Sequence, residues 1–186
     1  MGKNFIGVYD NIISKKECEI LISLFEKSPQ LDGLCWYEGE IVVEPVIKQC
    51  KELDRCKFSD KSAISNIVLR GLKRCMDLYV KEYPDIEENI GSWRVEDGYC
   101  FQKYETESDG YKSWHCESSN LNTASRMLVW SFYLNNAKSG TQFRHFSTTR
   151  AKMGRGVIFP AAWTHFHKSE PNKGLKYLVT GWVRYE

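Results

Sequence analysis

The chain has 186 residues, of which 42% are hydrophobic and 13% aromatic, and it carries a formal net charge of +2. This composition excludes a disordered chain, and the length suits one domain with a sizeable hydrophobic core, so we expect a single domain over residues 1–186. Lysines and arginines are scattered among aspartates and glutamates. This scatter argues against nucleic acid as a partner, because a nucleic-acid-binding surface gathers its positive charge.

The cysteines, the first residues and the apolar runs indicate the cellular compartment of the protein. Seven cysteines stand at irregular spacings without a CxxC motif, which argues against a disulfide framework and a structural zinc site. The start, MGKNFIGVYD, shows neither a signal-peptide pattern nor a myristoylation motif. The longest apolar run, MLVW, is far too short to cross a membrane. We therefore expect a cytoplasmic protein with reduced thiols and no membrane partner.

Two segments of the N-terminal half have the apolar spacing of amphipathic helices. Residues 14–28 begin with a capping-box pattern, Ser14 and Glu17. Residues 60–84 repeat the helical spacing up to Pro84, which ends it. The apolar positions that fall on one face are Cys18, Leu21, Ile22 and Phe25 in the first segment and Ile64, Val68, Leu72, Cys75 and Tyr79 in the second. Residues 30–58 between them are ambiguous, with a candidate edge strand at 40–47.

The second half is rich in short β-type blocks. Turn signals such as TESDG, NNAKSG and PNKG separate them. Many short strands joined by glycine-containing turns indicate an all-β barrel or a double-sheet jelly roll, with the two helices covering one outer face. The expected strands span residues 93–105, 111–118, 126–136, 141–146, 154–161 and 175–186.

The stretch WHCES, residues 114–118, places His115 and Glu117 two positions apart. On a strand, residues i and i+2 point to the same face, so both side chains would reach one ion while Cys116 would point away. An imidazole and a carboxylate suit a borderline cation such as Fe(II), Mn(II) or Zn(II). An exposed strand that carries two polar residues gives the same pattern, so this motif leaves both interpretations open.

A second histidine pair lies near the C-terminus. His165 and His167 are followed by Lys176 in apolar and aromatic surroundings. One more histidine beside His115 and Glu117 would complete a 2-His-1-carboxylate triad, which leaves positions open on an iron ion. A buried lysine needs a paired anion, and a dicarboxylate co-substrate would supply one. By alternation both His165 and His167 would face inward, so His165 could support the ligands or contact a substrate.

These motifs together resemble the 2-oxoglutarate and Fe(II)-dependent oxygenases, in particular their prolyl-4-hydroxylase-like branch. The resemblance runs through most of the chain, and no single motif would carry it. It implies a double-stranded β-helix (jelly-roll, cupin-like) core over residues 91–186, with a strand and supporting helices in 1–90. The matching segments are FIGVYDNIISKKECEILISLFE, YETESDGYKSWHCE, SRMLVWSFYLNNAKSGTQF, GRGVIFP and HKSEPNKGLKYLVTGW.

Carried over position by position, the resemblance implies that His115, Glu117 and His167 bind iron. His167 precedes Lys176 by nine residues, which fits the family pattern, whereas His165 fits another version of it. Glu117 stands where the family usually has aspartate, and some members of the branch resemble this chain in using glutamate. One added methylene requires the ion or the strand to shift.

The resemblance also implies residues for the co-substrate. Lys176 would pair with the distal carboxylate of 2-oxoglutarate, and Tyr104 would hydrogen-bond it. Thr180 would lie on the same face as Lys176 and line the pocket. Arg126 and Thr141 match positions near the site and receive no role. The turn before Thr141 reads KSGTQF, which departs from the glycine pattern of the family.

The chemistry that the resemblance implies is hydroxylation of an unactivated C–H bond. Fe(II), 2-oxoglutarate and O2 would take part, succinate and CO2 would be the co-products, and ascorbate is a candidate further cofactor. A prolyl residue is one candidate target. The primary substrate stays open among peptides, free amino acids and other small molecules.

Three rival functions remain at this stage. A halogenase of the same family lacks the carboxylate ligand, which Glu117 argues against. A non-catalytic, cupin-like metal-binding barrel would need neither Lys176 nor Tyr104. An inactive relative that serves as an interaction module would fail to bind iron. The tryptophans near the motifs, Trp114, Trp163 and Trp182, are expected to be packing residues.

Overall fold

Antiparallel β-sheet dominates the structure, a computed structural model that describes residues 3–54 and 56–186. Within these residues, one large sheet contains β1 (Gly7–Tyr9), β2 (Gln30–Asp32), β6 (Lys51–Leu53), β7 (Cys56–Lys57), β8 (Trp93–Tyr104), β10 (Arg126–Tyr133), β13 (Arg155–Pro160) and β15 (Lys176–Tyr185). Its order is β1-β13-β10-β15-β8-β6-β2, and β7 pairs with β8. The expected mainly-β fold is confirmed.

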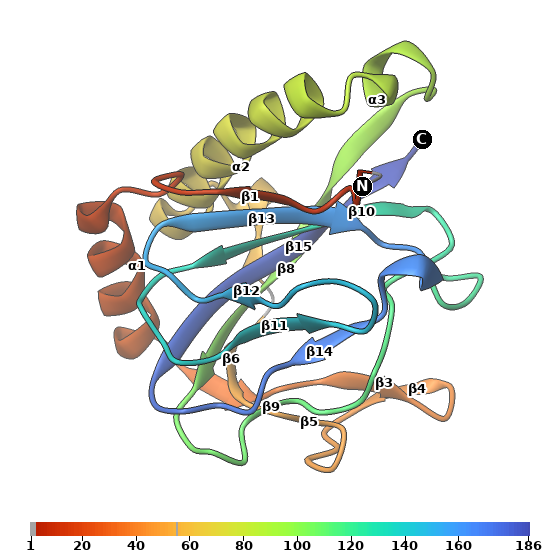
Figure 1. Ribbon diagram of the computed structural model, residues 1–186. Helices are drawn as coiled ribbons and strands as arrows, with labels where there is room; N and C mark the ends of the chain where they lie inside the picture. The colour runs from red at the N-terminus through yellow and green to blue at the C-terminus, as the bar shows by residue number, and fades with distance from the viewer. Residues whose placement is uncertain (1–2, 55) are drawn as a thin grey trace.

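A smaller sheet lies in front of the large one in Figure 1. It contains β12 (Thr149–Arg150), β11 (Gly140–Phe143) and β14 (His167–Ser169). Phe143 of this sheet packs with Val129, Val157 and Phe159 of the large sheet in one buried cluster. The two sheets are therefore the layers of a β-sandwich. Two further strand pairs lie below them: β3 (Cys35–Tyr37) with β4 (Glu40–Val42), and β5 (Lys48–Gln49) with β9 (Gly110–Tyr111).

Helices cover the opposite face of the large sheet. They are α1 (Lys15–Lys27), α2 (Ala63–Glu82) and the single-turn α3 (Asp85–Glu88), with 3-10 turns at Phe58–Asp60 and Trp163–His165. The capping box is confirmed, since Ser14 and Glu17 bond each other's backbone N–H groups. The second helix ends at Glu82, two residues before Pro84. No helix among the described residues has the length and apolar character to span a membrane.

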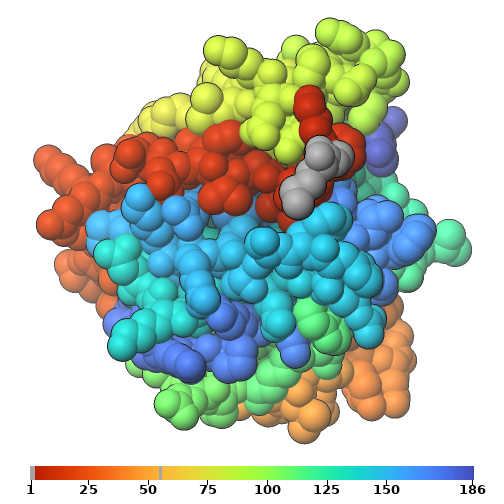
Figure 2. All heavy atoms as spheres, in the orientation of Figure 1, coloured from red at the N-terminus to blue at the C-terminus, as the bar shows by residue number. Residues whose placement is uncertain are grey.

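The first strand closes one edge of the large sheet. β1 pairs with β13, and Tyr79 of α2 donates a hydrogen bond to the carbonyl of Phe5 at 2.9 Å. Figure 2 shows the red N-terminal segment lying between the yellow-green helix α2 and the blue strand β13. β1 is thus a short edge strand whose N-terminal side is attached to α2, and short edge strands limit pairing with other chains.

The long strands β8, β10 and β15 have two different faces, because successive side chains alternate. One face is apolar and packs against the helices, with Tyr99, Phe101, Trp130, Phe132, Val179 and Val183 in the main core. The other face lines a cavity and carries polar side chains, among them Cys100, Gln102, Ser131 and Thr180. The candidate site lies on this second face.

One local prediction is wrong, and a second is borne out only in part. The strand expected over residues 111–118 is largely absent: β9 ends at Tyr111, and His115 forms only an isolated bridge with His167. Residues 30–58 were ambiguous in sequence and contain a set of very short strands, of which β4 covers only part of the candidate edge strand at 40–47. These segments pair with distant residues, which local patterns do not encode.

Candidate metal centre

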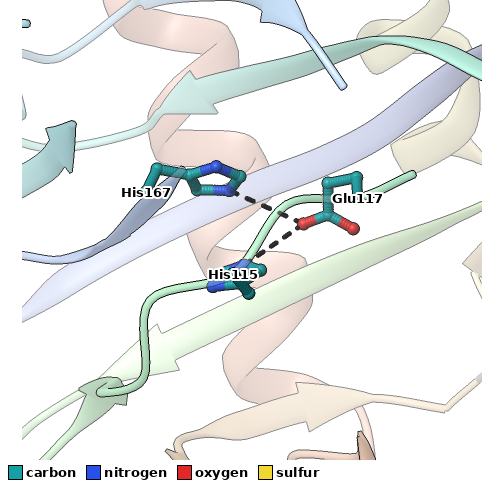
Figure 3. Close-up of side chains that lie close together, drawn as sticks. All are labelled: His115, Glu117 and His167. Carbon is teal, nitrogen blue, oxygen red and sulfur yellow. Dashed lines mark ion pairs between the residues drawn. The ribbon is translucent and has the colours of Figure 1, made fainter. Parts of the chain in front are cut away.

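Two histidines and a glutamate from separate parts of the chain converge in the cavity. Oε1 of Glu117 lies 3.3 Å from Nε2 of His115 and 3.6 Å from Nε2 of His167. One ligand atom from each of the three residues lies within 4.8 Å of the other two. Figure 3 shows both imidazoles turned toward the same carboxylate oxygen. This spacing allows the three side chains to hold one ion.

The backbone brings His115 and Glu117, which lie outside any regular strand, to His167 at the start of β14. His115 and His167 exchange two backbone hydrogen bonds, of 3.1 and 2.9 Å. The N–H groups of Glu117 and Ser118 both donate to the carbonyl of Ala161 at 3.0 Å. The segment that carries His115 and Glu117 is therefore hydrogen-bonded to Ala161, before the 3-10 turn Trp163–His165, and to His167, after it. The two side chains do project together as predicted, although the strand alternation behind that prediction is not what aligns them.

Backbone carbonyls set the tautomers of both histidines. Nδ1 of His115 lies 3.1 Å from the carbonyl of Ser113, and Nδ1 of His167 lies 3.0 Å from the carbonyl of His165. A carbonyl only accepts hydrogen bonds, so each Nδ1 carries a proton and each Nε2 presents a lone pair. Two Nε2 lone pairs and a carboxylate oxygen then face one another, a donor set that suits a cation between them.

The charge states agree with this donor set. Burial alone would raise the pKa of Glu117, but His115 and His167 outweigh it and hold the pKa well below its ordinary value. Burial, with the neighbouring His115, lowers the pKa of His167. At neutral pH the site therefore contains an ionised carboxylate beside a neutral His167, as metal binding requires.

Aromatic rings fix the orientation of the imidazoles. Tyr111 stacks on His115 with the ring centroids 3.7 Å apart, and Phe159 meets His167 edge-on at 4.8 Å. Rings held by packing lose little conformational entropy when they bind an ion, so the site is organised in advance.

A cavity of about 930 Å³ surrounds these three residues. Its inner wall is the polar face of the large sheet. Its rim includes Leu34, Trp36 and Ile41 of the β3–β4 region and Trp163 of the 3-10 turn, all large side chains with high exposure. The volume is ample for a small dicarboxylate together with part of a larger molecule.

Lys176 is buried, with 2% of its surface exposed, and its Nζ lies 4.5 Å from the ring centroid of Tyr104. Among the residues that the structure describes, Nζ makes no hydrogen bond or ion pair. Burial lowers the pKa of Lys176 to about 8. Tyr104 and Leu178 line the cavity whereas Lys176 does not. The lysine is thus a buried cation at the cavity's inner end that lacks a protein counter-ion.

The other residues singled out for the co-substrate have partners of their own. The hydroxyl of Tyr104 donates to Oε1 of Gln102 at 2.6 Å. Thr180 lines the cavity, and its hydroxyl donates to the carbonyl of Trp130 at 2.8 Å. Thr141 lies 2.6 Å from the hydroxyl of Tyr133. Tyr104 and Thr180 therefore face the cavity as alternation predicts, with hydrogen bonds that hold them in place.

Sequence reasoning missed how Arg126 and Trp182 contact the site. Nε1 of Trp182 donates to Oε2 of Glu117 at 2.9 Å, and Arg126 lies 3.3 Å from the same oxygen. Trp182 was expected to be a packing residue and Arg126 had no role. One signal was present: Trp182 follows Thr180 by two positions, which puts both on the cavity face.

His165 does not join the other two histidines. It lies in a 3-10 turn, so the alternation that would have turned it inward does not apply. Its Nε2 lies 2.9 Å from the carbonyl of Asn4, and its ring stacks on Phe146. Only its carbonyl reaches the site, through Nδ1 of His167. The ring of His165 is therefore buried away from the cavity, and the expectation that it faces the site is wrong.

Comparison with known proteins agrees with the sequence resemblance at the level of the fold. No family model and no curated protein matches the sequence. A viral collagen prolyl hydroxylase from Paramecium bursaria chlorella virus-1, in a complex with 2-oxoglutarate, is 14% identical with a TM-score of 0.65, over 100% of this chain and 98% of that one.

Two further solved structures are similar. A prolyl hydroxylase from Trichoplax adhaerens, in complex with a hypoxia inducible factor peptide fragment, is 14% identical with a TM-score of 0.71, over 98% of this chain and 84% of that one. A prolyl-4-hydroxylase from Pseudomonas putida is 13% identical with a TM-score of 0.64, over 99% and 94%. The chain therefore has the fold of these prolyl hydroxylases along nearly its whole length.

Proposed function

We propose that this protein is an Fe(II)- and 2-oxoglutarate-dependent dioxygenase that hydroxylates an unactivated C–H bond. The observation that carries the proposal is the convergence of His115, Glu117 and His167, with both Nε2 atoms aimed at one carboxylate oxygen. The shared fold with prolyl hydroxylases supports it. A non-catalytic barrel would explain the three ligands and would give no reason for the buried Lys176.

The donor set fits Fe(II). Two imidazole nitrogens and one carboxylate oxygen form one face of a six-coordinate ion and leave positions for a co-substrate and O2. Bound iron would supply the activation of O2 and the oxidising step. The chain's own part is to fix the Nδ1–H tautomer of both imidazoles through the carbonyls of Ser113 and His165, and to place Oε1 of Glu117 opposite their Nε2 atoms.

The co-substrate would lie between this triad and Lys176. A dicarboxylate gives Lys176 the anion that it lacks among the described residues, and a buried cation gains most from such a partner. Tyr104 would turn its hydroxyl from Gln102 toward the carboxylate, and Thr180 would line the same wall. A co-substrate that filled this end of the cavity would displace water from the reacting centre.

The primary substrate is proposed to be a peptide. The viral relative is named a collagen prolyl hydroxylase, and the Trichoplax relative binds a hypoxia inducible factor peptide fragment. The cavity is open at a rim with exposed apolar side chains, which leaves room for a chain that continues beyond the site. A prolyl side chain is the first target to test.

We also propose that the two sheets form a double-stranded β-helix and that residues 1–186 are one domain.

The test is succinate formation from 2-oxoglutarate in air with Fe(II), measured by NMR with and without proline-containing peptides. We expect iron-dependent succinate that His115→Ala abolishes. His145→Ala is the matched control, because His145 is exposed and outside the site. Equal succinate from wild type and His115→Ala, or none from wild type under any peptide, would overturn the proposal.

A further inference from the structure

The two oxygens of Glu117 have different surroundings. Oε1 faces the histidines, at 3.3 and 3.6 Å. Oε2 accepts a hydrogen bond from the indole of Trp182 at 2.9 Å and lies 3.3 Å from a terminal nitrogen of Arg126. The carboxylate is therefore held from behind while one oxygen is presented to the site.

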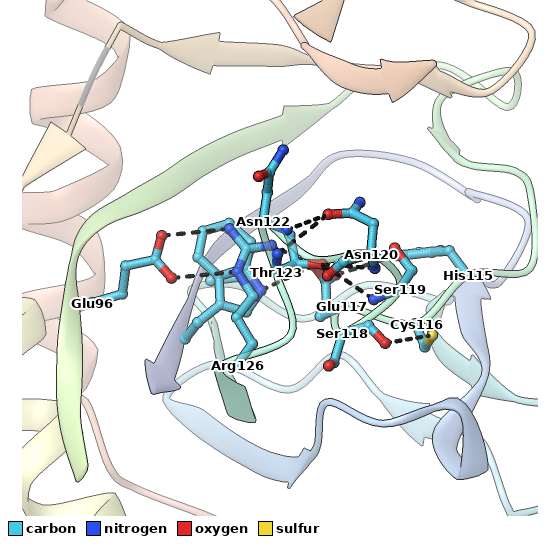
Figure 4. Close-up of polar contacts among 12 residues, drawn as sticks. Glu96, His115, Cys116, Glu117, Ser118, Ser119, Asn120, Asn122, Thr123 and Arg126 are labelled. Atoms are coloured by element: carbon cyan, nitrogen blue, oxygen red, sulfur yellow. Dashed lines mark hydrogen bonds and ion pairs between the residues drawn. The ribbon is translucent and has the colours of Figure 1, made fainter. Parts of the chain in front are cut away.

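The two groups behind Glu117 are themselves braced. The guanidinium of Arg126 stacks on the ring of Trp182, 3.6 Å from its centroid. On its other side it contacts both oxygens of Glu96 at 3.3 and 3.4 Å. Figure 4 shows Arg126 lying between Glu96 and Glu117. An arginine with its planar fork held at both edges and its face covered has little freedom to move.

The backbone is irregular where these side chains arise. The β8–β15 pairing shifts register between Gly181 and Val183, which flank Trp182, and the β10–β15 pairing shifts between Arg126 and Leu128. Glu96 lies in the stretch of β8 between the shifted pairs. Such irregularities re-aim side chains and recur beside functional sites. Both shifts lie beside Trp182 and Arg126, although Trp182 still pairs with Val129 and Arg126 with Arg184.

We propose that Trp182 and Arg126 are positioning residues that restrict Glu117 to a single-oxygen contact with the metal. The inference rests on the proposed metal site. By occupying Oε2, they prevent the longer glutamate side chain from rotating or binding with both oxygens, so that one more coordination position stays open. This contact sets the reach of the carboxylate: an aspartate at 117, one methylene shorter, would be unable to meet the indole and the metal together.

The test is Mn(II) binding to the metal-free protein, residues 1–186, followed by EPR, which does not require turnover. Loss of an outer partner of a metal ligand lowers metal affinity by about 10- to 100-fold. We expect this loss for Trp182→Phe, which removes the N–H donor and keeps a ring, and for Arg126→Gln. Arg184→Lys is the control, because Arg184 lies 3.8 Å from Glu96 and is not a partner of Glu117.

A double-mutant cycle separates positioning from a general structural effect. Glu117→Asp should lower affinity in the wild-type background, and adding Trp182→Phe should then cost little more, because the indole no longer has a glutamate to hold. Additive losses would overturn the inference, as would wild-type affinity in both Trp182→Phe and Arg126→Gln. If Trp182→Phe fails to fold, the cycle is run with Arg126→Gln. A wild-type protein that binds no Mn(II) removes the proposed function as well, so the two failures are distinguishable.

Discussion

The two faces of the strands β8, β10 and β15 differ in chemistry, although alternate residues of the same three strands form them. On the helix-facing side, Phe101, Trp130 and Val179 are fully buried among apolar neighbours. On the cavity side, Gln102, Lys176 and Thr180 are polar. Burying polar groups costs free energy unless each has a partner. The apolar, helix-facing side therefore stabilises the fold, and the polar cavity side lowers its stability.

Within residues 3–54 and 56–186, each face contains a buried polar group without a close polar partner, and the two groups show how the faces differ. Nε1 of Trp130 is buried without a hydrogen-bond partner among the described residues. That is a neutral group whose unmet hydrogen bond costs about 1–3 kcal/mol. Lys176 on the cavity side is a cation, for which burial is far more costly. An uncompensated cation therefore indicates a ligand, whereas an unpaired indole N–H is compatible with packing alone.

The largest expected effect is at the metal centre that the cavity face borders, from His167→Ala in β14. We expect the variant to lose detectable Fe(II) binding, because two ligands remain of three, while the metal-free protein keeps its fold through the helix-facing core. Fe(II) titration under argon and circular dichroism measure the two properties. A variant that binds iron as wild type does would show that His167 is not a ligand.

On the helix-facing side, Phe101→Ala should destabilise the protein by about 3–5 kcal/mol, as truncation of a buried phenylalanine does. Phe101 is fully buried and packs against Phe25 with ring centroids 4.8 Å apart. Urea unfolding measures the change. Metal affinity of the folded variant should match wild type, and a parallel fall in affinity would show that the two faces are not separate.

Lys176→Met should stabilise the protein by about 3 kcal/mol at pH 7, since each unit of pKa shift corresponds to about 1.4 kcal/mol. Burial lowers the pKa of Lys176 from 10.5 to about 8. The wild-type penalty is fully present below pH 8 and disappears as pH rises from 8 to 10.5. Thermal unfolding at pH 7 and pH 10 measures it. A variant less stable than wild type at pH 7 would contradict a charged, unpaired lysine.

The same pKa predicts how co-substrate binding depends on pH. Below pH 8 the free protein carries a protonated Lys176 and the affinity for 2-oxoglutarate should be nearly constant. Above pH 8 binding requires proton uptake, so the dissociation constant should rise about tenfold per pH unit. Calorimetry with Mn(II)-loaded protein measures this dependence. An affinity that stays flat to pH 9.5 would remove Lys176 from the binding site.

The smallest effect is expected at the helix that covers the apolar face. Ser14→Ala removes the side-chain cap of α1 and should lower the free energy of unfolding by about 1 kcal/mol. Iron and 2-oxoglutarate affinities should not change. Urea unfolding with calorimetry checks both, and Ser23→Ala, in the same helix without a capping contact, is the control.

Periodic segments were the predictable part of the fold. The spacing of α1 and α2 and the alternation of β8, β10 and β15 each encode a buried face, and the structure places these elements close to their expected bounds. The segments around residues 30–58 and 111–118 were predicted poorly. Their short strands and the His115–His167 bridge depend on pairing with distant residues, which leaves no local period to read.

The site divides in the same way. His115, Glu117 and His167 were found from spacing and from the resemblance, and the structure brings them together. His165 was misplaced because a 3-10 turn interrupts the strand. The contacts of Arg126 and Trp182 with Glu117 were missed: alternation from Thr180 places Trp182 on the cavity face, but no local pattern pairs these residues with a glutamate far away in the chain.

An anaerobic titration with Fe(II) and 2-oxoglutarate tests the central claim most directly. The proposed site predicts a weak visible charge-transfer band from the chelated co-substrate, which His115→Ala abolishes and Lys176→Ala weakens by lowering affinity for 2-oxoglutarate. His145→Ala should leave the band unchanged. Iron binding without the band would contradict the co-substrate site, and a band that persists in His115→Ala would contradict the metal centre itself.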